Sequence, residues 1–210
     1  MKTEVLAILD RSGSMQSVRD EAIGGFNAFL GEQQKNPDPA KITLVLFDHE
    51  YLPVYEAKDL PLADRLTPET FVPRGSTAMN DAIGRTLHEQ GARIKVEGWA
   101  EKVIVCLVTD GHENSSKEFS QAAVQALVKE KEALGWSFVF LFAGISQAQA
   151  VSTTQGYGVN TNSLSNMAKS FRSGPAGQSV GYDTLSTSVG NLRGGGTAQV
   201  PDPAEQNKSP

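Results

Sequence analysis

The chain is poor in cysteine and in basic runs. Its single cysteine, Cys106, lies inside the apolar run at residues 103–108, so no internal disulfide can form. A thiol in such a run behaves as a small hydrophobic side chain, and the absence of a disulfide favours a reducing compartment. The formal net charge is −5 and no basic cluster is present, which argues against a protein that binds nucleic-acid backbones.

Long apolar stretches are missing as well. No segment approaches the ~18 uninterrupted apolar residues of a membrane span. Residues 1–4 lead directly into the first apolar run, without the apolar core of a signal peptide. We therefore expect a cytoplasmic protein that makes no contact with membranes. A hydrophobic fraction of 39% over 210 residues is sufficient for one domain with a sizeable core.

Apolar runs alternate with helical patterns along the chain, which predicts a doubly wound α/β domain. Strands are predicted at residues 5–9, 41–47, 51–57, 102–109 and 136–143. Helices are predicted at residues 17–34, 78–96, 117–134 and 146–155, and around Leu185, Val189 and Leu192. Ser17-x-x-Asp20 and Ser115-x-x-Glu118 have the spacing of capping boxes for two of these helices, and Ser146 is the expected cap of a third.

The end of the chain is harder to assign. Residues 156–178 are rich in Ser, Asn and Gly, and are compatible with one further strand and a turn. We expect a single domain over residues 1–193. Residues 194–210 are rich in Gly and Pro and cannot bury enough apolar area to order themselves, which predicts a flexible tail.

Oxygen-bearing side chains follow two of the apolar runs. Asp10, Ser12 and Ser14 alternate with spacer residues directly after the first run, and Asp110 ends the run at 102–109. Because the carboxyl ends of parallel strands meet at one edge of a sheet, we expect these groups to lie close together, with Thr77 on a loop between them. Carboxylate and hydroxyl oxygens are the ligands that hard divalent cations prefer.

The three segments together resemble the metal-ion-dependent adhesion site of von Willebrand factor type A domains. Asp10, Ser12 and Ser14 match its first loop, Thr77 its second and Asp110 its third, so the five-residue set is complete. The chain looks similar to stand-alone intracellular members from bacteria and phages. The resemblance implies a three-layer fold whose mostly parallel central sheet has helices on both faces. It also implies that the hairpin around residues 48–50 supplies one antiparallel edge strand.

The same resemblance implies how the site works. Ser12, Ser14 and Thr77 would be direct ligands of Mg²⁺ or Mn²⁺, with Ca²⁺ less suitable, and Asp10 and Asp110 would act partly through water. An Asp or Glu carboxylate of a partner protein would complete the coordination. The sequence thus predicts a divalent-metal-dependent protein-binding module and not an enzyme.

Two other functions stay open at this point, a structural part of a larger phage or chaperone-linked assembly and a metal-dependent hydrolase. No general base and no phosphate-binding loop accompany the site, which counts against the hydrolase. We expect structural or solvated roles for Asp81, His112 and Glu113 near the site. Gly13, Gly75 and Gly111 are expected to let the loops approach the ion. The partner and the oligomeric state are left open.

Overall fold

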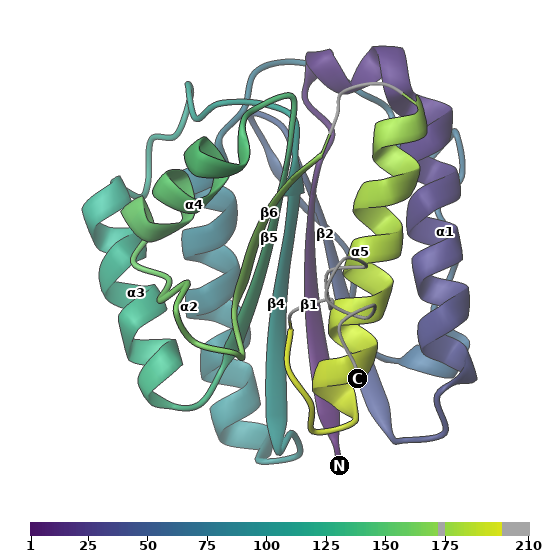
Figure 1. Cartoon of the computed structure of the whole chain (residues 1–210), viewed down its shortest axis with the longest axis vertical. Helices are drawn as coiled ribbons and strands as arrows, with labels where there is room; N and C mark the ends of the chain where they lie inside the picture. The colour runs from purple at the N-terminus through teal and green to yellow at the C-terminus, as the bar shows by residue number, and fades with distance from the viewer. Residues whose placement is uncertain (172–174, 199–210) are drawn as a thin grey trace, which may run out of the picture.

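The computed structural model describes residues 1–171 and 175–198, and within them six strands form one sheet in the order β3-β2-β1-β4-β5-β6 (Figure 1). The parallel pairs are β1 with β2, β1 with β4, β4 with β5 and β5 with β6. Only the pairing of β3 with β2 is antiparallel in this sheet. The mostly parallel sheet with one antiparallel edge strand is therefore confirmed. The strands are β1 (Thr3–Asp10), β2 (Ala40–Phe47), β3 (Tyr51–Asp59), β4 (Lys102–Thr109), β5 (Ser137–Ala143) and β6 (Met167–Phe171).

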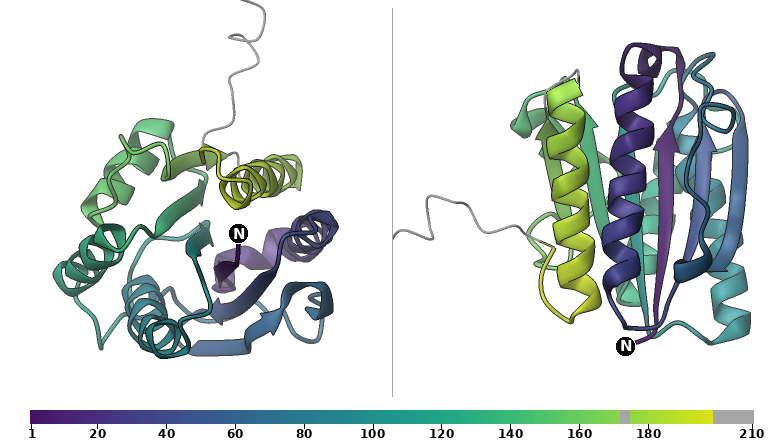
Figure 2. Two further views of the ribbon diagram at one scale, coloured as in Figure 1. Left: turned by 90° about the horizontal axis from the view of Figure 1, so that it is seen from below. Right: turned by 90° about the vertical axis from the view of Figure 1, so that its right-hand side faces the viewer.

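Helices cover both faces of the sheet, which gives three layers (Figure 2). One face carries α1 (Arg19–Lys35) and α5 (Pro175–Arg193), which lie side by side. The other carries α2 (Met79–Glu97), α3 (Gln121–Ala133) and α4 (Gln147–Gly156). Short 3₁₀ helices, η1 (Gly13–Val18) and η2 (Leu60–Leu62), follow β1 and β3.

Alternate residues of β1 supply the two halves of the core. Val5 and Leu9 point toward α1 and α5, where they join one buried cluster. Leu6 and Ile8 belong to the second cluster, beneath α2, α3 and α4. This period-two alternation explains why the central strand reads as a continuous apolar run, since a parallel strand in the middle layer is buried on both faces.

The predicted start of α1 is wrong by two residues. Ser17 does not form a capping box with Asp20: its hydroxyl donates to the carbonyl of Ser14, 3.3 Å away, inside η1. The helix begins at Arg19, and its N-cap residue Val18 offers no side-chain acceptor.

The predicted start of α3 is also wrong. Ser115 and Glu118 form no capping box, because the carboxylate of Asp81 accepts the backbone N–H groups of residues 117–119 at 2.8 to 2.9 Å. These three residues are held in a loop by a side chain from α2. The N-cap is instead Ser120, whose hydroxyl accepts the N–H of Ala123.

Two predictions for the last third of the chain are confirmed, the cap at Ser146 and a further strand after residue 156. Ser146 caps α4 in a reciprocal capping box with Gln149. The segment at 156–178 contains β6, whose outer edge is covered by the side-chain amide of Gln147: Nε2 donates to Ala168 O at 2.7 Å and Oε1 accepts Ser170 N at 2.9 Å.

The expected tail is only partly within the described residues. Residues 199–210 lie outside them, as do residues 172–174. Of the part that is described, Ala198 is buried and its N–H donates to the carbonyl of Leu164 at 2.8 Å. Over residues 1–171 and 175–198, no helix combines the length and the apolar character that crossing a membrane requires.

A buried arginine connects the ends of α1 and α5. Arg193 is 1% exposed, and its guanidinium donates to the carbonyls of Gln33 at 2.6 Å and Asp38 at 2.9 Å. These acceptors lie at and just beyond the C-terminal turn of α1, where carbonyl groups lack helical partners and attract a cation.

We expect Arg193→Ala to lower the free energy of unfolding by about 3 kcal/mol, because it removes the buried hydrogen bonds to the Gln33 and Asp38 carbonyls and opens a cavity. Urea denaturation of the whole chain measures this change. Lys129→Ala, at an exposed position on α3, serves as the control and should shift the free energy by less than about 0.5 kcal/mol. Equal effects of the two substitutions would contradict a structural role for Arg193.

Candidate metal centre

The two strand ends deliver two carboxylates to neighbouring positions. Asp10 is the last residue of β1, and Asp110 directly follows β4, its parallel neighbour. Oδ1 of Asp10 accepts the N–H of Ser12 at 2.6 Å, and Oδ2 accepts the hydroxyl of Thr109 at 2.5 Å. The hydroxyls of Ser12 and Ser14 lie 3.1 Å apart, and that of Ser14 donates to Oδ1 of Asp110 at 2.7 Å. The structure thus links four of the five predicted residues by one series of hydrogen bonds, in which Asp10 joins through the backbone N–H of Ser12.

The fifth side chain, Thr77, joins them across Gly111. A Cβ atom on Gly111 would lie 2.8 Å from Oγ1 of Thr77 and 3.3 Å from Oδ2 of Asp10. The two oxygens therefore flank a space that any side chain at position 111 would fill. This space lies among oxygen donors, which is the setting that a small hard cation requires.

Backbone hydrogen bonds fasten the three loops to one another. The N–H of Gly13 donates to the carbonyl of Gly75 at 3.1 Å. Thr77 and Asn114 exchange two bonds, from Thr77 N to Asn114 Oδ1 at 2.9 Å and from Asn114 N to Thr77 O at 3.0 Å. Gly75 has a φ of +64°, a backbone conformation that favours glycine, and a Cβ there would collide with the His49 ring.

Both carboxylates are poorly solvated. Burial raises the pKa of the Asp10 carboxyl to about 6, despite the hydrogen bonds from Thr109 and Ser12 that act in the opposite direction. Burial also raises the pKa of Asp110, against the hydrogen bond from Ser14. Each acid would gain from a nearby positive charge, which a divalent cation between the loops supplies. The donor set therefore fits such an ion.

Side chains that the sequence did not single out as ligands build the surroundings. Thr109 orients Asp10, as described above. Asp81 and Glu113 have structural roles, as expected: Glu113 accepts the N–H groups of Asn80 at 2.7 Å and Ser116 at 2.8 Å. His112 is exposed. Over the described ranges, no three His, Cys, Asp or Glu side chains gather as a possible metal site, so a cation held between these loops would need the hydroxyl groups of Ser and Thr as well.

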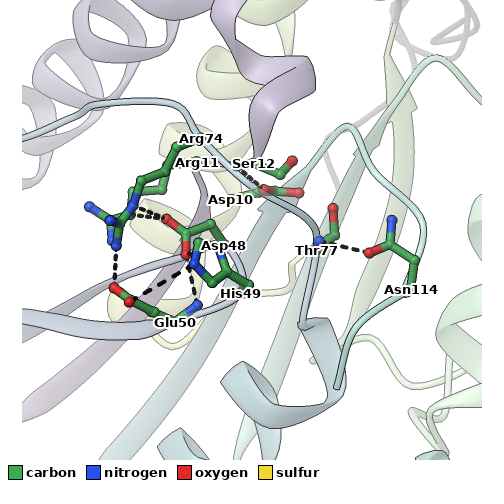
Figure 3. A network of polar contacts seen from close by, with 9 residues as sticks. All are labelled: Asp10, Arg11, Ser12, Asp48, His49, Glu50, Arg74, Thr77 and Asn114. Atoms are coloured by element: carbon green, nitrogen blue, oxygen red, sulfur yellow. Dashed lines mark hydrogen bonds and ion pairs between the residues drawn. The ribbon is translucent and has the colours of Figure 1, made fainter. Parts of the chain in front are cut away.

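A charged cluster borders the site on one side. Figure 3 shows Asp48 between two groups, with Asp10, Ser12 and Thr77 on one side and the guanidinium groups of Arg11 and Arg74 on the other. From the sequence, residues 48–50 are predicted only to connect the two strands of a hairpin. A buried carboxylate in a short polar link carries no periodic signal that would have identified it.

Comparisons with known proteins place the fold. No family profile and no curated protein sequence matches this chain. Among solved structures, mussel byssus proximal thread matrix protein 1 with a zinc-occupied MIDAS motif is 16% identical, covers 90% of this chain and 48% of its own, and gives a TM-score of 0.61. The vWF domain of the type V pilus tip protein Mfa5 from Porphyromonas gingivalis is 11% identical. The match covers 95% of this chain and 97% of that domain, with a TM-score of 0.63.

A von Willebrand factor type A protein from Catenulispora acidiphila is 16% identical, covers 90% of this chain and 43% of its own, and gives a TM-score of 0.59. This chain spans less than half the length of the byssus and Catenulispora chains that it matches. At these identities the likeness shows the fold, which is that of a von Willebrand factor type A domain.

We expect Gly111→Ala to weaken Mg²⁺ binding at least about tenfold, because the added methyl would displace the Thr77 hydroxyl from the space beside Asp10. Isothermal titration calorimetry measures the change. Gly31→Ala in α1 is the matched control, since nothing lies within 4 Å of its Cβ position. Unchanged affinity in the Gly111 variant would show that the space does not hold the ion.

The Asp10 carboxyl should also make the free energy of unfolding of the metal-free protein depend on pH. Its folded pKa of about 6 exceeds the ordinary value of 3.8, so the ionised form opposes folding. This cost is absent below about pH 4, grows as the pH rises, and is complete above about pH 6. In EDTA, Asp10→Asn should therefore be more stable than the wild type by about 2 kcal/mol at pH 7.5, with little difference at pH 4.

Urea unfolding at the two pH values measures this difference, with the exposed Asp183→Asn as control. A stability difference that did not depend on pH would rule out the assigned cost of the Asp10 carboxylate.

Proposed function

We propose that this chain is a protein-binding module that depends on a divalent cation, Mg²⁺ or Mn²⁺ before Ca²⁺. The side chains that would hold the ion are Asp10, Ser12, Ser14, Thr77 and Asp110. The observation that carries the proposal is the linkage of Ser12, Ser14 and Asp110 by hydrogen bonds at the carboxyl ends of β1 and β4, with the Thr77 hydroxyl and the Asp10 carboxylate both close to Gly111. Parallel α/β sheets bind ligands at such a point.

The hydrogen bonds of the loops support different roles for hydroxyls and carboxylates. Both oxygens of Asp10 already accept protein donors, from Ser12 N and Thr109 Oγ1, which favours contact with an ion through water. The hydroxyls of Ser12, Ser14 and Thr77 are then the direct ligands. An ion bound through neutral hydroxyls supplies an electrophilic centre with an open position, for which a carboxylate is the best complement.

The partner is therefore proposed to be a protein that presents an Asp or Glu side chain. Two of the similar structures come from a pilus tip protein and a byssal thread matrix protein, which supports protein binding as the activity. We propose binding and not catalysis, since the site's polar groups hold one another and the loops in place. The cytoplasmic location remains a prediction from the sequence.

Calorimetric titration with Mg²⁺ and with Mn²⁺ tests the site directly. We expect one ion per chain for the wild type and a loss of binding of at least about tenfold for Asp110→Ala, with Asp183→Ala as an exposed acidic control. A wild-type chain that binds neither ion at millimolar concentration would overturn the proposal.

The open coordination position is tested with Mn²⁺ and acetate as probes. Water-proton relaxation reports the waters on bound Mn²⁺, and acetate should lower the relaxation rate of the wild-type complex by displacing one of them. Capture of partners in Mg²⁺ with release by EDTA then identifies proteins for the same assay. Relaxation that acetate leaves unchanged would argue against carboxylate recognition.

A further inference from the structure

Asp48 is a fully buried carboxylate that two arginines share. The residue directly follows β2 and its side chain is 0% exposed. Its Oδ2 lies 3.0 Å from Nε of Arg11 and accepts a hydrogen bond from Nε of Arg74 at 2.9 Å. Oδ1 accepts the N–H of Glu50 at 2.7 Å, and the Glu50 carboxylate pairs with the outer end of Arg74. We call Asp48, Arg11 and Arg74 the arginine clamp.

The clamp joins two of the loops that carry candidate ligands. Arg11 stands between Asp10 and Ser12 on the first loop, and Arg74 precedes the segment that leads to Thr77. Backbone bonds reinforce the connection, from Arg74 N to Arg11 O at 2.9 Å.

The carbonyl of Asp48 also accepts the N–H of Ala78 at 2.7 Å. Ala78 is the residue directly after Thr77. Asp48 thus holds the second loop on both sides of Thr77. Its carboxylate binds Arg74 before Thr77, and its backbone carbonyl binds Ala78 after it. No atom of the clamp belongs to the proposed ligand set.

The contact between Arg11 and Asp48 is chiefly an attraction of charges. Nε of Arg11 is close to the carboxylate, but its N–H has no hydrogen-bond acceptor within the described part of the chain. Burial lowers the pKa of Arg11, and the pKa of Arg74 is raised by its hydrogen bonds to Asp48 and Glu50. Removal of one partner from a buried group of this kind leaves an uncompensated charge, so the clamp has one strongly preferred arrangement.

We propose that the arginine clamp is a positioning unit that fixes Thr77 against Ser12 and Ser14, and so makes the site selective for Mg²⁺ over Ca²⁺. This inference rests on the proposed function. Mg²⁺ demands near-octahedral oxygen ligands at about 2.1 Å, whereas Ca²⁺ accepts flexible geometry at about 2.3 to 2.6 Å. Loops that cannot move apart favour the smaller ion, and looser loops lose that preference.

Arg74 is the position at which to test the clamp. Its side chain is 45% exposed, and Arg11 still faces the Asp48 carboxylate when Arg74 is replaced, so the fold should survive. The electrostatic effect of the substitution on cation affinity is opposite to the effect expected from lost positioning. Removal of a positive charge near the site would by itself strengthen the binding of every cation. A loss of Mg²⁺ affinity therefore identifies positioning, and a gain identifies electrostatics alone.

The experiment measures Mg²⁺ and Ca²⁺ dissociation constants of the full chain by calorimetry. For Arg74→Gln we expect Mg²⁺ binding to weaken about tenfold and Ca²⁺ binding to change less than about twofold. Arg74→Lys, which keeps the charge beside Asp48, should recover part of the loss. Arg85→Gln is the matched control, since Arg85 is a partly exposed arginine of α2 that pairs with Glu118 and lies over the ring of Tyr51, neither of which belongs to the clamp.

Each outcome decides a different question. A wild type that binds neither ion overturns the proposed function and this inference with it. A wild type that binds Mg²⁺, with an Arg74→Gln variant that binds it equally or more tightly, overturns the clamp alone. Equal weakening of Mg²⁺ and Ca²⁺ binding would also overturn it, because selectivity would be unchanged. Thermal unfolding in EDTA checks that each variant is folded.

Discussion

The parallel pairing of β1 with β4 is the constraint on which the candidate site depends. The chain leaves β1 toward α1 on one face of the sheet and leaves β4 toward α3 on the other. Loops that diverge in this way leave a crevice between neighbouring strand ends. The hydrogen bond from Thr109 to Asp10 joins the two strands at that point. Without this register, the oxygens of the first and third loops would not share a space.

The ends of β1 and β4 carry buried acidic groups, which cost stability when they lack a charged partner. Asp10 is buried and lacks a cationic partner among the described residues, and burial raises the pKa of Asp110 as well. In contrast, Asp48 is equally buried but held by two arginines. Within the described residues, cationic side chains therefore pair with the Asp48 carboxylate and none pairs with that of Asp10.

The sequence predicted most of the fold because its signals are local. A buried parallel strand must be apolar on both faces, so β1, β4 and β5 were found to within about two residues. The capping box at Ser17 failed because its hydroxyl bonds locally to the carbonyl of Ser14, and the one at Ser115 failed because the Asp81 carboxylate holds residues 117–119. The apolar pattern of β6 is weak in the sequence because the strand is short and partly exposed.

The candidate site was predictable for a different reason. Asp10, Ser12 and Ser14 lie on one short loop, and the strand ends fixed where Asp110 would lie. The clamp around Asp48 could not be predicted in the same way, because its partners are 26 and 37 residues away and their pairing depends on the folded loops. Long-range ion pairs leave no periodic trace in a sequence.

The amide of Gln147 has a consequence for how the molecule meets its surroundings. By bonding Ala168 O and Ser170 N, it occupies the place that the peptide group of a seventh strand would take. At the opposite border, β3 carries Pro53, which has no N–H to offer a neighbour. Lateral growth of the sheet is discouraged on both flanks. Contacts that other macromolecules make at these two edges would therefore have to rely on side chains and not on backbone pairing.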